Sequence, residues 1–100
     1  MHKLRLGKTG QIYIPTRIRK EIDFELGDLI NIILDGENLI LSNKDGYEEE
    51  NKCVISQGGF VHIPTEIRRF SNFSEEDVFK VILDKKEKQL NLILDVKIPV

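Results

Sequence analysis

Basic side chains are concentrated in the first twenty residues of the chain. This segment holds six cations and no acidic residue: Lys3, Arg5, Lys8, Arg17, Arg19 and Lys20. A second basic pair, Arg68 and Arg69, follows the pair Arg19 and Lys20 at a distance of 49 positions. Clustered lysines and arginines neutralise phosphates and release counterions, and arginine can also bond guanine in the major groove. This pattern predicts contact with nucleic acid; the alternative is that the cations form only a solvated helix face.

No other set of side chains in the sequence suggests catalysis or metal binding. His2, His62 and Cys53 lack metal-ligand spacing, and Cys53 has no evident base partner. Asp35 and Asp84 are related acids that could share a proton, but each is expected at a hairpin turn. The sequence shows no glycine-rich phosphate loop and no catalytic triad. We therefore predict no enzymatic activity, no metal and no cofactor.

Composition sets broad limits on the class of protein. One hundred residues, 40% apolar and 32% charged, suit one small globular domain. A single cysteine excludes an internal disulfide and fits a reducing compartment. No apolar run approaches a membrane span, and the N-terminal residues lack the apolar region of a signal peptide, so we predict a cytoplasmic protein without membrane contact. The formal charge of −2 conceals an acidic segment at residues 45–52, which contrasts with the basic beginning.

The chain contains an internal repeat with a shift of 49 residues. Residues 10–35 align with residues 59–84, and eleven of the 26 pairs are identical, far more than chance would give. The identical pairs include Gly10 and Gly59, Pro15 and Pro64, Thr16 and Thr65, and Arg19 and Arg68. Two units are too few for a solenoid. We therefore predict a pseudo-dimer in which residues 1–44 and 53–100 close on one another and residues 45–52 link them.

Each half predicts the same order of elements, namely two strands, a short helix and a hairpin. The strands are expected over residues 3–8, 11–14, 29–35 and 39–42 in the first half and over 53–56, 60–63, 78–84 and 90–94 in the second. Pro15 ends a strand and begins a helix, because proline cannot donate to a ladder and suits the first helical turn. Helices are expected over residues 17–22 and 65–70, with Thr16 as the N-cap of the first.

Alternation of apolar residues predicts which side chains form the core. The predicted core consists of Ile12, Ile14, Ile18, Leu29, Ile32 and Leu34 in the first half and Val61, Ile63, Ile67, Val78, Val81 and Leu83 in the second. Gly27 suits a turn with a positive φ. Glu76 stands at the corresponding place, so the second turn is expected to be built differently.

The repeated stretch has a recognisable pattern. The first half carries GQIYIPTRIRK at residues 10–20 and LGDL at residues 26–29, and VHIPTEIRR recurs at residues 61–69. This order resembles the AbrB/MazE/SpoVT family of small DNA-binding modules, in which a glycine turn, a strand ending in I-P, a short basic helix and G-D follow one another. The resemblance covers residues 3–43 well and residues 53–95 more loosely.

The resemblance implies a mostly β fold with short helices, a swapped-hairpin β-barrel in which two units interlace. Here one chain is expected to supply both units; the alternative is pairing with a second chain in a homodimer. By position, the resemblance implies that five cations contact double-stranded DNA: Arg5, Arg19, Lys20, Arg68 and Arg69. Lys8 and Arg17 join the predicted DNA-binding residues because they belong to the same basic N-terminal segment. Gln11 and Phe60 replace the basic residue usual after the turn glycine, and residues 54–61 hold no cation. DNA contact is therefore expected to be asymmetric, with the first half dominant.

Three functions remain open from the sequence. The first is a DNA-binding transcriptional regulator of the AbrB-like type, which needs no cofactor. The second is a MazE-like antitoxin that binds a toxin protein. The third is a barrel that has lost DNA binding and serves protein interaction. The acidic segment at residues 45–52 suits a solvated tether, a shield for the basic face, or a contact with a partner.

Overall fold

The computed structural model describes residues 3–44 and 51–95. Most of the predicted acidic linker lies outside the described residues, as do residues 96–100. In chain order, the described elements are β1 (Lys3–Arg5), β2 (Gln11–Tyr13), α1 (Thr16–Glu21), β3 (Leu29–Asp35), β4 (Asn38–Ser42), β5 (Lys52–Val54), β6 (Phe60–His62), α2 (Thr65–Phe70), β7 (Val78–Asp84) and β8 (Gln89–Leu94). The two halves thus have the same order of elements, while their origin as copies of one unit stays a prediction.

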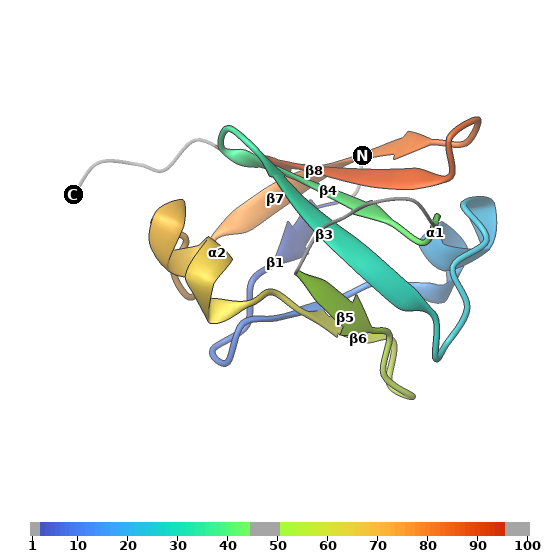
Figure 1. Ribbon diagram of the computed structural model, residues 1–100, viewed down its shortest axis with the longest axis horizontal. Helices are drawn as coiled ribbons and strands as arrows, with labels where there is room; N and C mark the ends of the chain where they lie inside the picture. Colours follow the sequence, from blue (N-terminus) through green and yellow to red (C-terminus); the bar gives the residue numbers. More distant parts are fainter. Residues whose placement is uncertain (1–2, 45–50, 96–100) are drawn as a thin grey trace.

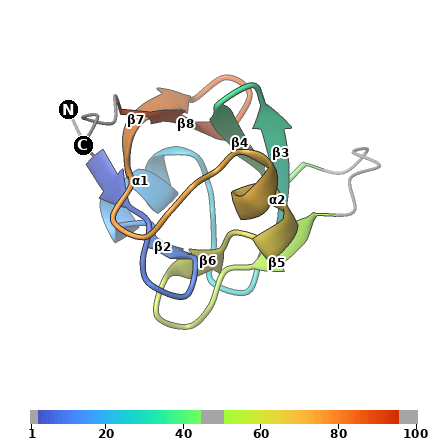
Figure 2. The same ribbon diagram turned by 90° about the vertical axis from the view of Figure 1, so that its left-hand side faces the viewer.

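The strands form a large curled sheet and a small two-stranded ribbon, which covers the side that the curled sheet leaves open. Six strands are hydrogen-bonded in the order β1-β7-β8-β4-β3-β5, and β2 and β6 form a separate antiparallel pair. Figure 2 shows the sheet curling around the interior, with the β2–β6 pair below and the two helices at the sides. The predicted fold class, a mostly β barrel with short helices, is confirmed.

The two halves interlock, because four strand pairings each join a strand of the first half to a strand of the second. β1 of the first half pairs with β7, and β5 of the second half pairs with β3. β4 pairs with β8 across the middle of the large sheet, and β2 pairs with β6 in the ribbon (Figure 1). Each half therefore completes the sheet of the other within one chain, as expected for a swapped-hairpin arrangement.

The core is built from inward-facing side chains of both halves. Ile12, Ile14, Ile18, Ile32, Val61, Ile63 and Ile67 are buried as predicted, and Leu34, Val81 and Leu83 are partly buried against them. The predicted burial of Leu29 is wrong, because its side chain is 52% exposed and Ile30 faces the core instead. Val78 is only half-buried, and Phe79 is buried next to it in an edge-to-face contact with Phe73 at 5.2 Å between ring centroids. The near-continuous apolar run of β3 gave no alternation from which to choose the inward face.

Several predicted element boundaries differ from the structure by one to three residues, among them the end of β1 and the start of α1. β1 ends at Arg5 rather than at residue 8, because Leu6 leaves the strand and its N–H donates to the Asp77 carbonyl at 2.8 Å. Thr16 is not the N-cap of α1, which is Pro15, and no side chain caps that helix. The Thr16 hydroxyl instead accepts a hydrogen bond from the Arg19 side chain.

The turn before β7 contradicts the prediction that it is built differently from the turn before β3. Glu76 has φ +75° and Gly27 has φ +92°. The Gly27 N–H donates to Ile55 at 2.8 Å, and the Glu76 N–H makes the matching bond to Leu6 at 3.0 Å. Glutamate therefore occupies a left-handed conformation that favours glycine. Its carboxylate pairs with Arg5 at 3.0 Å.

We expect Glu76→Gly to be more stable than Glu76→Gln by about 0.5–1 kcal/mol. Both variants lose the pairing with Arg5, but only glycine relieves a left-handed strain of roughly 1–2 kcal/mol, less the extra freedom that glycine has in the unfolded chain. Urea denaturation of the two variants measures the difference. Equal stabilities would show that the positive φ at this position is not strained.

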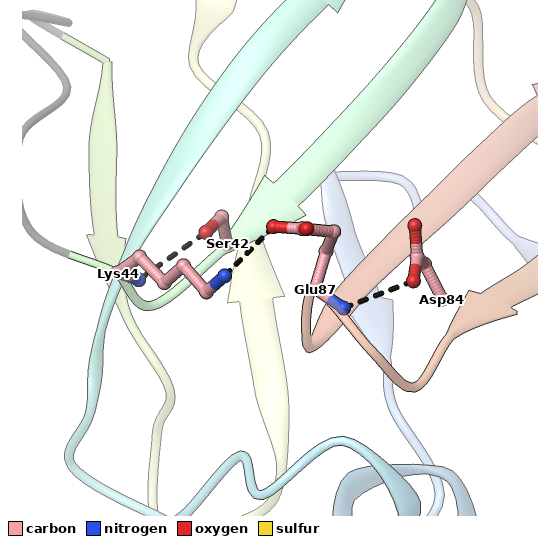
Figure 3. Close-up of polar contacts among 4 residues, drawn as sticks. All are labelled: Ser42, Lys44, Asp84 and Glu87. Atoms are coloured by element: carbon pink, nitrogen blue, oxygen red, sulfur yellow. Dashed lines mark hydrogen bonds and ion pairs between the residues drawn. The ribbon is translucent and has the colours of Figure 1, made fainter.

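The turn between β7 and β8 settles the role of Asp84. Its carboxylate accepts a hydrogen bond from the Glu87 N–H at 3.0 Å, and Glu87 in turn pairs with Lys44 at 2.8 Å, joining this turn to the end of β4 (Figure 3). Asp35 lies at the opposite end of the sheet, because β4 and β8 run antiparallel. The two acids do not form a dyad. Within residues 3–44 and 51–95, no group of histidine, cysteine and acidic side chains is placed to hold a metal ion.

Candidate nucleic-acid interface

The β2–β6 ribbon is the element from which the candidate site is built. Gln11 pairs with His62, Ile12 with Val61, and Tyr13 with Phe60. Because side chains alternate along a strand, the fully buried Ile12 and Val61 face the core and the other four face outward. The ribbon therefore has an outer face made of one amide, one imidazole and two aromatic rings.

The turn of each half packs on the strand-to-helix corner of the other half. The Ile14 N–H donates to the Gly59 carbonyl at 2.9 Å, and the Ile63 N–H donates to the Gly10 carbonyl at 2.8 Å. The turn of residues 7–10 therefore lies at the start of α2, and the turn of residues 56–59 lies at the start of α1. Figure 1 shows both turns projecting on the side of the ribbon, away from the β7–β8 turn.

Arg19 and Arg68 hold these corners together. The Arg19 Nε donates to the Ile14 carbonyl at 2.9 Å, and its Nη2 donates to the Thr16 hydroxyl at 2.9 Å. Arg68 makes the same pair of bonds to the second corner, each at 3.0 Å: Nε to the Ile63 carbonyl and Nη2 to the Thr65 hydroxyl. Both arginines are half-buried. Two of the seven predicted DNA-binding residues therefore have a structural task in addition to their charge.

Each of these guanidinium groups also lies against a turn glycine of the other half. A methyl group added at Gly10 would lie 2.6 Å from Cζ of Arg68. At Gly59 it would lie 3.0 Å from the Tyr13 ring and 3.4 Å from Nη2 of Arg19. Gly10 and Gly59 have φ values of +89° and +86°. We call this arrangement of Arg19 with Gly59 and Arg68 with Gly10 the arginine clasp; it needs glycine for conformation and for space.

The remaining predicted cations lie on the surface. Lys8, Arg17, Lys20 and Arg69 are exposed, and Arg5 is exposed but paired with Glu76. Since the turns are exchanged, Lys8 lies at the end of the ribbon where α2 carries Arg68 and Arg69. At the other end α1 carries its own three cations. Apart from Arg5, each end therefore has three of the predicted contacts, although the second turn has no cation of its own; the prediction of asymmetric DNA contact stays untested.

Gln11, at the position where the family has a basic residue, has a local task in this chain. Its Oε1 accepts hydrogen bonds from the Thr9 N–H at 3.1 Å and from the Thr9 hydroxyl, and it covers Gly7. His62, its partner across the ribbon, contacts the Thr9 carbonyl through Nε2. Both side chains therefore hold the first turn.

Sequence reasoning missed the contact between the two exposed aromatic residues. Tyr13 and Phe60 are 44% and 40% exposed, and their ring centroids lie 5.4 Å apart with the planes inclined at 55°. They belong to different positions of the repeat, so the alignment of the halves did not bring them together. Antiparallel pairing of β2 with β6 does.

The sequence of the first half matches a known family. Residues 3–48 match the family described as "Antidote-toxin recognition MazE, bacterial antitoxin". The first half is similar to MazE antitoxins. The predicted resemblance to the AbrB/MazE type is therefore confirmed over this segment, and the interlocked barrel agrees with it. That the second half is a further copy of the MazE-like unit stays a prediction.

The wider comparisons add no closer relative. No curated protein and no solved structure matched the chain. In the described parts of the chain, no helix combines the length and the apolar character that a membrane crossing requires. The family description is that of an antidote protein rather than an enzyme, and absence of catalysis in this chain stays a prediction.

Proposed function

We propose that the protein is a DNA-binding regulator that binds double-stranded DNA through the β2–β6 ribbon, its two turns and the cations of α1 and α2. The observation that carries this proposal is the exchange of turns, which gives each end of one ribbon three cations. Lys8, Arg68 and Arg69 are grouped at one end, and Arg17, Arg19 and Lys20 at the other. Two similar basic groups related by a pseudo-two-fold axis suit a roughly palindromic duplex site.

We expect the protein to bind duplex DNA with an affinity that falls steeply with salt. Each phosphate contact contributes about −0.9 to the slope of log K against log salt concentration, so six contacts predict a slope near −5. Fluorescence anisotropy with a pool of random duplexes at several salt concentrations measures it, and size-exclusion chromatography gives the number of chains bound. Absence of binding at low salt would leave the barrel as a protein-interaction module.

We propose antitoxin activity as the second candidate function, because the description of the matching family favours it directly. The expected result is a stable complex with a toxin protein and rescue of the growth arrest that the toxin causes. Co-expression with toxins encoded beside the gene tests this proposal. DNA binding and toxin binding are compatible, so each result is judged separately.

A further inference from the structure

The outer face of the ribbon carries two aromatic rings at the end that adjoins α1 and the turn of residues 56–59. Tyr13 and Phe60 face each other across the strand pair and are both well exposed, although the neighbouring Ile12 and Val61 are fully buried. Exposed aromatic rings are common at binding sites, since they bring a large apolar area with little loss of side-chain entropy. This pair therefore suits a ligand with apolar groups at the corresponding place.

We propose that Tyr13 and Phe60 contact the C5-methyl groups of thymines in the major groove of the bound duplex. The inference rests on the proposed DNA-binding function and names the part of the DNA that determines specificity. The major groove admits a two-stranded β-ribbon, and thymine is the base that presents a methyl group there. The matching protein partner is an apolar side chain such as phenylalanine.

The distribution of charge along the ribbon supports this placement. The predicted cations lie at the two ends, on the turns and helices, where phosphates would flank a ribbon seated in the groove. The four outward residues of the ribbon, which lie between these two groups of cations, include no lysine, arginine, aspartate or glutamate. Gln11 and His62 already hold Thr9, whereas the two rings contact each other and Tyr13 also lies against Gly59. These contacts restrict the two rings before DNA binds, which lowers the entropic cost of contact.

The experiment compares thymine with deoxyuridine, which differs only in lacking the methyl group. A duplex selected by the wild-type protein from a random pool is resynthesised with each thymine replaced in turn. We expect the wild-type protein to lose about fourfold in affinity for each contacted methyl, the equivalent of one buried methylene. The variant carrying Tyr13→Ala and Phe60→Ala should bind more weakly, should not distinguish the two duplexes, and should keep its salt slope.

A matched control is Phe70→Ala, which removes a phenylalanine that is 84% exposed at the end of α2, away from the ribbon. It should retain discrimination between thymine and deoxyuridine. Urea denaturation verifies that each variant is folded, and the milder Tyr13→Leu with Phe60→Leu replaces the alanine variant if that one is not. Leucine keeps an apolar contact, so part of the discrimination should remain.

The outcomes separate this inference from the proposed function. If the wild-type protein binds duplexes but does not respond to deoxyuridine at any position, the methyl contact is overturned and DNA binding stands. The methyl contact is also overturned if the wild-type protein binds all duplex sequences equally, or if the variant carrying Tyr13→Ala and Phe60→Ala still distinguishes thymine from deoxyuridine in full. A preference for single-stranded DNA that depends on Tyr13 and Phe60 would overturn the methyl contact and indicate that the two rings stack on bases. If no nucleic acid binds at low salt, the proposed function itself fails.

Discussion

Gly10→Ala should lower the free energy of unfolding by about 2–4 kcal/mol. Gly10 is buried with φ +89°, and an added methyl group would lie 2.6 Å from the guanidinium of Arg68. The left-handed conformation costs an alanine roughly 1–2 kcal/mol. The displaced arginine would also lose its two hydrogen bonds to the corner, which costs about 1–3 kcal/mol in a half-buried place, while alanine returns about 0.4–1 kcal/mol by reducing the entropy of the unfolded chain. Urea denaturation measures the loss.

Gly27→Ala is the matched control for this prediction. Gly27 has nearly the same φ, +92°, but an added methyl group there would meet no atom within 4 Å. It should therefore cost about 1 kcal/mol, the strain less the entropy that alanine removes from the unfolded chain. In an Arg68→Ala background, Gly10→Ala should cost no more than Gly27→Ala, since the two changes remove the same contact. Additive effects of Gly10→Ala and Arg68→Ala would show that the arginine clasp is not a unit.

The order of the elements could be predicted from the sequence because it depends on local patterns. Pro15 and Pro64 end strands wherever they stand, and alternating apolar residues around Ile12 and Val61 mark an inward face. The register of strand pairing is not local. Leu29 and Ile30 lie in a near-continuous apolar run, and only the pairing of Leu29 with the exposed Val54 determines which of them points outward.

The candidate site could be predicted as a set of cations but not as an arrangement. A charged helix residue bonded to the carbonyl five residues earlier looks, in a sequence, like one in solvent. The signal that could have revealed the arginine clasp was the pattern of identity between the halves. Gly10, Thr16 and Arg19 are identical to their counterparts, whereas Arg17 is replaced by Glu66. The identical positions are those that the clasp uses, and the variable one is exposed.

Glu76 shows the opposite limit of sequence reasoning. Replacement of a turn glycine suggested a different turn, yet the backbone kept the positive φ because its hydrogen bond to Leu6 belongs to the interlocked sheet. Tertiary context here overrides the conformational preference of the residue. Only the pairing of β1 with β7, which the local sequence does not contain, explains this.

Lys20→Ala combined with Arg69→Ala should reduce the slope of log K against log salt concentration by about 2, without a change in stability. Both side chains are exposed at the ends of the short helices, outside the hydrogen bonds of the corners. Loss of each phosphate contact lowers the slope by about 1. Fluorescence anisotropy at several salt concentrations measures the slope. Lys86→Ala, an exposed cation on the β7–β8 turn, is the matched control and should leave it unchanged.

The combination of Arg19→Ala and Arg68→Ala should behave differently, because these side chains fix the corners. It should lower the free energy of unfolding by about 2–4 kcal/mol, a loss that includes four hydrogen bonds at half-buried groups. Lysine at both positions separates charge from geometry, since it keeps the charge but cannot form the guanidinium fork. The lysine variant should lose stability and keep the salt slope. A stable lysine variant would limit the structural part of the clasp to its glycines, and a reduced slope would show that phosphate contact at these two positions needs the guanidinium group and not only its charge.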